Sequence, residues 1–202
     1  MTEYYYSKNP QVRHHLRRLS FSALGLRLQF ITDNGVFSKS AVDHGSQVII
    51  NYAPVGEMPD GMILDLGCGY GPIGITLAKY YPQRRFLLTD VNNLALKLAK
   101  KNAHINRVTN VRIFSSDVYS KINQHLAGII TNPPIRAGKK VVMTILKEAD
   151  HYLLPNGILT AVVRRKQGEP SAKRAMKNTF GNCQIIKRDK GYYVLKSVKK
   201  EV

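Results

Sequence analysis

Hydrophobic and polar positions change their spacing along the chain at about residue 62. Before that point, short apolar runs flank turn residues and predict a β-hairpin over 19–31. A helix over 43–52 follows, with Asp43 as its N-terminal cap. From Met62 onward, short apolar runs alternate with stretches in which apolar residues recur every three or four positions. That alternation predicts strands that alternate with helices.

The predicted strands cover residues 62–66, 85–89, 111–115, 127–131, 158–164, 184–186 and 192–198. The predicted helices cover residues 72–80, 93–106, 140–152 and 171–180. Strands joined by helical crossovers form a mostly parallel sheet with helices on both faces, so we expect a doubly wound α/β fold. Because residues 54–61 hold two prolines and two glycines, we predict an N-terminal extension of residues 1–57 packed on a core domain of residues 58–202.

Composition narrows the possible partners. The chain has 202 residues, 44% of them hydrophobic, and a formal net charge of +18. Its apolar runs are too short to cross a bilayer, its first ten residues resemble no secretion signal, and two cysteines cannot form a disulfide framework. We therefore expect a soluble, cytoplasmic protein. A strongly basic surface attracts polyanions, and residues 164–202 carry half of the excess charge, so a nucleic acid is the expected partner.

A glycine-rich loop follows the first strand of the core, with Gly67, Gly69 and Gly71 in close succession. Glycines at this place let the backbone turn tightly and let a ligand approach it. The spacing also fits a dinucleotide-binding loop. Asp90 ends the next strand, where a carboxylate can accept hydrogen bonds from ribose hydroxyls, although it could equally cap the following helix.

Two further carboxylates favour a sulfonium cofactor over a dinucleotide. Asp65 precedes the glycines, where a negative charge would repel a pyrophosphate but attract the ammonium group of a bound amino acid. Asp117 follows the third strand, where it could accept from an adenine amino group or be a surface turn residue.

Residues 63–74, together with Leu88-Thr89-Asp90, resemble the S-adenosylmethionine site of Rossmann-like class I methyltransferases. The resemblance implies a seven-stranded, mostly parallel sheet with an antiparallel C-terminal strand. It also implies that the three loop glycines border the methionine part of the cofactor, that Asp90 holds the ribose and that Asp117 meets the adenine. The cofactor site expected on this basis comprises Asp65, Gly67, Cys68, Gly69, Gly71, Asp90, Val91, Asp117 and Asn132.

The sequence Asn132-Pro133-Pro134-Ile135 directly follows the fourth strand. An amine conjugated to a ring or carbonyl is a poor nucleophile because its lone pair is delocalised. The amide oxygen of Asn132 and the carbonyl of Pro133 could both accept hydrogen bonds from such an amine, while the prolines fix the backbone. We therefore predict that Asn132 and Pro133 are catalytic in an in-line methyl transfer to nitrogen.

This motif resembles that of methyltransferases acting on exocyclic or amide nitrogens, which often carry an aromatic residue where Ile135 stands. We predict that the substrate RNA contacts Ile135 and the basic residues near it, which can bind phosphates. These basic residues are Arg136, Lys139, Lys140, Arg164 and Arg165.

The upstream sequence Gly35-Val36-Phe37-Ser38, with Asp43 and Gly45-Ser46-Gln47, resembles that of bacterial small-subunit ribosomal RNA methyltransferases specific for guanine. Phe37 is either a pocket residue or a core aromatic. The resemblance implies methylation of the exocyclic amine of a guanine in ribosomal RNA. Two alternatives remain: an enzyme that methylates a glutamine amide in a protein, and a basic RNA-binding assembly factor without activity. Six scattered histidines show no metal-ligand spacing, so no metal site is predicted.

Overall fold

The computed structural model describes residues 8–10, 13–134 and 137–201, which form two β-sheets and five α-helices. The strands are β1 (Arg17–Ala23), β2 (Leu26–Thr32), β3 (Met62–Leu66), β4 (Arg85–Asp90), β5 (Val111–Ser115), β6 (Leu126–Thr131), β7 (Leu153–Arg164), β8 (Gln184–Asp189) and β9 (Tyr192–Val198). The helices are α1 (His44–Tyr52), α2 (Pro72–Tyr80), α3 (Asn93–Ile105), α4 (Lys139–Tyr152) and α5 (Glu169–Phe180).

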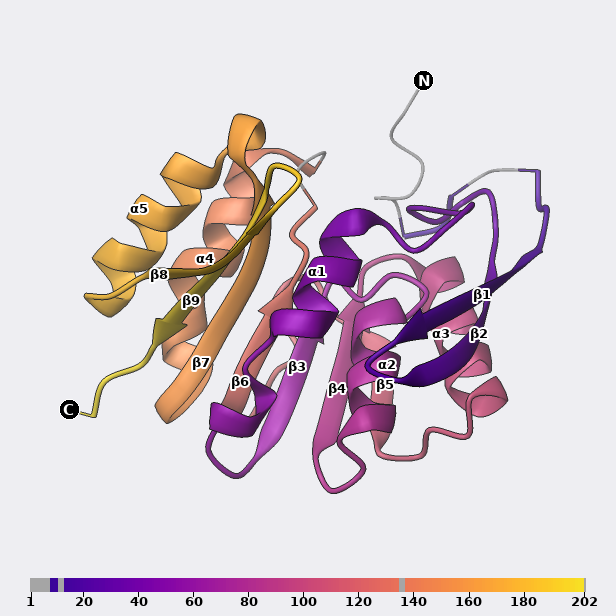
Figure 1. Cartoon of the computed structure of the whole chain (residues 1–202), viewed down its shortest axis with the longest axis horizontal. Helices are drawn as coiled ribbons and strands as arrows, with labels where there is room; N and C mark the ends of the chain where they lie inside the picture. Colours follow the sequence, from indigo (N-terminus) through magenta and orange to yellow (C-terminus); the bar gives the residue numbers. More distant parts are fainter. Residues whose placement is uncertain (1–7, 11–12, 135–136, 202) are drawn as a thin grey trace.

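The main sheet has seven strands in the order β5-β4-β3-β6-β7-β9-β8 (Figure 1). Strands β3 to β7 pair in parallel, whereas β9 lies antiparallel between β7 and β8. The predicted Rossmann-like sheet with one antiparallel C-terminal strand is therefore confirmed. Because β9 runs against its neighbours, its first residue lies at the same edge of the sheet as the last residues of the parallel strands.

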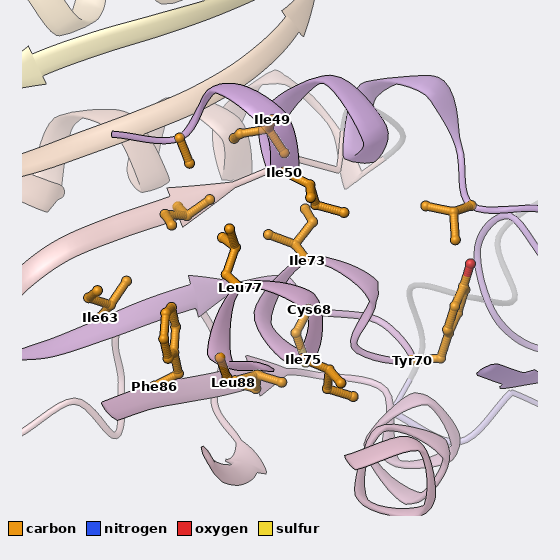
Figure 2. Packing of buried hydrophobic residues seen from close by; sticks show 14 of the residues in the cluster. Ile49, Ile50, Ile63, Cys68, Tyr70, Ile73, Ile75, Leu77, Phe86 and Leu88 are labelled. Atoms are coloured by element: carbon orange, nitrogen blue, oxygen red, sulfur yellow. The ribbon is translucent and has the colours of Figure 1, made fainter. Parts of the chain in front are cut away.

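Alternate residues of the strands enter two hydrophobic clusters, one on each face of the sheet. On β3, Ile63 belongs to the cluster that also holds residues of α1, α2 and α3, whereas Leu64 belongs to the one that holds residues of α4 and α5. In the first cluster, Ile50 of α1 points toward Ile73 of α2 (Figure 2). Burial on both faces is what a continuous apolar strand predicts.

Most predicted elements agree with the structure to within two or three residues. The clearest difference lies at residues 153–157, because the predicted strand begins only at Ile158. In the structure β7 begins at Leu153, and its pairing with β6 jumps from Leu126↔Leu153 to Gly128↔Ile158. The added residues therefore form an irregularity inside a longer strand, with Asn156 at a φ of 62°.

The N-terminal hairpin, β1 and β2, forms a separate two-stranded sheet that two asparagines tie to α3. Asn102 accepts from the backbone N–H of Ile31 at 2.7 Å and donates to its carbonyl at 3.0 Å. Asn106 makes the same pair of hydrogen bonds with Gln29, at 3.0 and 2.7 Å. The two amides therefore take the place of a third strand along the edge of β2.

Residues on both sides of the predicted boundary at residue 57 share one hydrophobic cluster. Phe30 and Ile49 come from the predicted extension, and Ile63 and Phe86 from the predicted core domain. The division of the chain at that residue stays a prediction. Within the described ranges, every helix is too short or too polar to cross a lipid bilayer.

Candidate active site

A cavity of about 250 Å³ opens at the carboxyl ends of β3, β4 and β6. The residues that line it include the predicted site residues Gly67, Cys68, Gly69, Asp90, Asn132, Pro133 and Arg164. The glycine loop and the Asn-Pro-Pro segment therefore face one shared space, as a transfer between a bound cofactor and an amine requires. Phe37 also lines this cavity and is 47% exposed, which places it in the pocket rather than in the core.

Four predicted cofactor residues do not line the cavity. Asp65 and Gly71 are buried behind the loop, and the backbone N–H of Val91 supports the carboxylate of Asp90. Asp117 is exposed beyond β5, the edge strand, and its N–H donates to Ser120 Oγ at 3.1 Å. Contacts of these four residues with a cofactor remain predictions.

The glycine loop leaves room for a ligand. Gly67 and Gly69 have φ values of 76° and 57°, which favour glycine, and a Cβ built on either would meet no atom within 4 Å. Gly71, at a φ of 94°, differs because a Cβ there would lie 2.4 Å from the Cδ1 of Ile75. The first two glycines thus fit the close approach of a cofactor, whereas Gly71 is required by packing against α2.

Asp90 is arranged to accept hydrogen bonds at the cavity wall. Its two carboxylate oxygens accept from the N–H groups of Gly69 and Asn92, each at 2.9 Å. Burial raises the pKa of this carboxyl, and the backbone donors, including Val91, partly oppose that rise. A carboxylate has about four acceptor positions, so beside its three backbone donors Asp90 keeps capacity for a ribose hydroxyl. The fit of S-adenosylmethionine rests on this carboxylate and on the open space above Gly67 and Gly69.

Asp65 supports the loop from below. Its Oδ2 accepts from the N–H of Gly74 at 2.8 Å, in the first turn of α2. Among the described residues, its Oδ1 is buried without a hydrogen-bond partner. Burial, together with the nearby Asp90, raises the pKa of Asp65 to about 7. The same surroundings raise the pKa of the Cys68 thiol, so Cys68 is protonated and is no nucleophile.

This pKa predicts how stability depends on pH. In an unfolded chain, aspartate has a pKa of about 4. Between about pH 4 and pH 7, Asp65 therefore holds a proton in the folded protein that the unfolded chain has released. The free energy of unfolding should therefore fall as pH rises through this window, by up to about 4 kcal/mol from this group. Urea unfolding should show a smaller fall for Asp65→Asn. The free energy of unfolding of this variant should therefore rise relative to that of the wild type between pH 5 and pH 8. The exposed Asp60→Asn is the control, and equal pH dependence in wild type and Asp65→Asn would contradict the prediction.

The side-chain amide of Asn132 is oriented by the start of α1. Its Nδ2 donates to Asp43 Oδ1 at 3.0 Å and to Ser46 Oγ at 3.2 Å. Because a carboxylate only accepts hydrogen bonds, the amide must turn its nitrogen toward Asp43 and its oxygen away. Within the described residues, no donor is bonded to Asn132 Oδ1. The amide oxygen is thus kept as an acceptor at the cavity.

Asp43 and Ser46 are themselves fixed. Asp43 caps α1 by accepting from the Ser46 N–H at 3.1 Å, and its Oδ2 accepts from the Ser46 hydroxyl at 2.5 Å. Next to Asn132, the Thr131 hydroxyl donates to the carbonyl of Leu66 at 2.9 Å. That bond joins the tips of β6 and β3, so the amide and the glycine loop keep a fixed separation.

The predicted RNA-contacting residues that the structure describes are all exposed: Lys139, Lys140, Arg164 and Arg165. Of these, Arg164 lines the cavity, and the two lysines begin α4 shortly after Pro134. Ile135 and Arg136 lie outside the described residues.

Two kinds of residue at the site were not predicted from the sequence to act there. Asp43 and Ser46 belong to a motif noted there, but their link to Asn132 joins positions 89 and 86 residues apart. Tyr192 lines the cavity from the start of β9, and nothing in the local sequence distinguishes it from Tyr193. Only the antiparallel insertion of β9 brings it to this edge.

Comparison with known proteins finds relatives in sequence and in structure. An uncharacterized protein of Bacillus subtilis, YbxB, is 42% identical over 98% of this chain and all of its own length. The ribosomal RNA small subunit methyltransferase C of Hahella chejuensis is 39% identical over 68% of this chain, which matches 41% of that protein. The chain spans about half or less of the length of such curated ribosomal RNA methyltransferases.

A solved structure shares the fold. The 16S rRNA N2 G1207 methyltransferase of T. thermophilus, solved with AdoMet and guanosine, superimposes with a TM-score of 0.82 at 24% identity. The match covers 92% of this chain and 51% of that one. Residues 27–196 match the model of a family described as the methyltransferase small domain. The chain therefore belongs to the methyltransferase small domain family.

Proposed function

We propose that the protein transfers a methyl group from S-adenosylmethionine to the exocyclic amine of a guanine in ribosomal RNA, and that it does so in the cytoplasm. The observation that carries this proposal is the orientation of Asn132. Its Nδ2 is engaged by Asp43 and Ser46, which leaves its oxygen to accept a hydrogen bond from an amine in the cavity shared with the glycine loop.

The residues would act by holding the amine rather than by removing its proton first. Asn132 Oδ1 and the carbonyl of Pro133 accept its two N–H groups, which favours the pyramidal nitrogen that develops during attack. Bound S-adenosylmethionine supplies an electrophilic methyl carbon on a positively charged sulfur. Holding nitrogen and methyl carbon in line supplies much of the rate, and the proton can leave afterwards.

The relatives and the charge support RNA as the substrate. Curated relatives named ribosomal RNA small subunit methyltransferase C match most of this chain, and the T. thermophilus enzyme is named for the N2 atom of a guanine in 16S rRNA. A net charge of +18 also suits a polyanionic substrate better than a protein side chain. A base inside a duplex would have to be flipped out to reach Asn132.

Labelled S-adenosylmethionine incubated with the purified protein and either ribosomal RNA or total protein tests the proposal. We expect label in RNA, recovered as N2-methylguanosine by nucleoside mass spectrometry. Label in a glutamine of a protein would replace the proposal with the rival amide methyltransferase. Label in neither fraction, together with no calorimetric binding of S-adenosylmethionine, would favour the assembly-factor alternative.

A further inference from the structure

The cavity extends past β6 to the ends of β7 and β9, which lie on the other side of β6 from the glycine loop. This end of the cavity is lined by Val162, Arg164 and Tyr192. Tyr192 and Arg164 face each other as the last pair of the ladder between β9 and β7. This end therefore presents an aromatic ring and a guanidinium group side by side.

The Tyr192 ring is held in place from several sides. Arg164 Nε donates to the Tyr192 hydroxyl at 2.7 Å, and the guanidinium carbon lies 4.8 Å from the ring centre. The His44 ring packs against it edge-on at 5.4 Å between centres. A Cβ on Gly45 would lie 2.9 Å from Tyr192 Cε1, so a glycine there lets the ring lie against α1.

One turn of chain sets the position of this ring relative to the amide acceptor. Asp43 and Ser46 hold Asn132, while His44 and Gly45, which lie between them, contact Tyr192. Residues 43–46 thus hold both side chains, two of them contacting Asn132 and two contacting Tyr192. Such an arrangement fixes a planar surface at a set distance from the atom that would accept the amine.

A ring beside a guanidinium group is suited to a planar, electron-rich ligand. Nucleobases that leave their helix stack on tyrosine rings and on arginine planes. The family resemblance places an aromatic residue after the Asn-Pro-Pro segment, where this chain has Ile135. A planar contact could come instead from an aromatic residue that lines the cavity, as Tyr192 does.

We propose that Tyr192, with Arg164 bonded to its hydroxyl, is the platform on which the target base stacks while its exocyclic amine reaches Asn132. This inference rests on the proposed function, and it assigns the recognition of the base to the C-terminal hairpin.

The chain contains no tryptophan, which allows a direct test. Tyr192→Trp introduces a single indole at the platform, and stacking of a purine should quench its fluorescence. Guanosine, added to the variant saturated with S-adenosylhomocysteine, should quench Tyr192→Trp but not Tyr193→Trp, because Tyr193 packs with the cluster on the opposite face. Equal quenching of both variants, or of neither, would overturn the platform.

Steady-state kinetics give a second readout. Tyr192→Ala should raise KM for ribosomal RNA about ten- to a hundred-fold, the loss typical of one stacking contact, with unchanged affinity for S-adenosylhomocysteine. Tyr192→Phe keeps the ring and should stay within about threefold of the wild type. A wild-type KM in Tyr192→Ala would also overturn the inference. Failure of the proposed function is distinguishable, because the wild type would then transfer no methyl group to RNA at all.

Discussion

Asn132→Ala is expected to lower kcat for methyl transfer by about a hundred- to a thousand-fold, by analogy with the loss of one preorganised hydrogen-bonding group at a reacting centre. The variant should bind S-adenosylmethionine almost as the wild type does, because Gly67, Gly69 and Asp90 are untouched. Single-turnover transfer to ribosomal RNA measures the first effect, and calorimetric titration with the cofactor measures the second.

A matched control removes an amide that has no part in the site. Asn178 is exposed on α5, on the other face of the sheet, so Asn178→Ala should transfer methyl groups at the wild-type rate. If Asn132→Ala kept the wild-type kcat, the assignment of Asn132 as the acceptor would be wrong.

The second large effect is expected from Asp43→Ser, because the carboxylate of Asp43 dictates which way the Asn132 amide faces. Serine is also a good helix cap, so α1 should remain intact. Its shorter side chain cannot reach Asn132, and the lost charge-assisted hydrogen bond is typically worth ~1.5–3 kcal/mol. We expect kcat to fall about ten- to a hundred-fold, with little change in the thermal stability or in cofactor affinity.

Asp43→Asn separates orientation from mere structural support. Its amide oxygen can take the place of Oδ1 and accept from both Asn132 and Ser46, so this variant should recover most of the activity. If Asp43→Ser were as active as the wild type, Asp43 would be only a helix cap. If Asp43→Asn were as impaired as Asp43→Ser, the negative charge rather than the orientation would matter.

Local patterns were sufficient for the features that depend on local interactions. Three apolar runs predict the strands β3, β4 and β6, and the glycines after Leu66 predict a tight loop. Because these strands are parallel, their carboxyl ends meet at one edge of the sheet. The same rule says less about Asp117, whose contact with a cofactor stays a prediction. It follows β5, which lies at the edge of the sheet two strands from β3, and it is exposed there.

Other features depend on contacts that no local pattern encodes. The hydrogen bond between Asp43 and Asn132 forms only because α1 packs across β7 and β9 at the mouth of the cavity. Tyr192 joins the site because β9 is inserted antiparallel between two other strands. In both cases the topology determines which residues meet, and the residue pattern predicts only the number and direction of the strands.

Asn102 of α3 and Asn106, which caps it, have a consequence for how copies of this protein behave toward one another. An exposed strand edge offers unpaired backbone groups to any other chain, and such edges promote edge-to-edge association. On β2, the outward N–H and C=O groups of Gln29 and Ile31 are already bonded to Asn106 and Asn102. A small hairpin outside the main sheet is thereby protected on this side from recruiting a foreign strand.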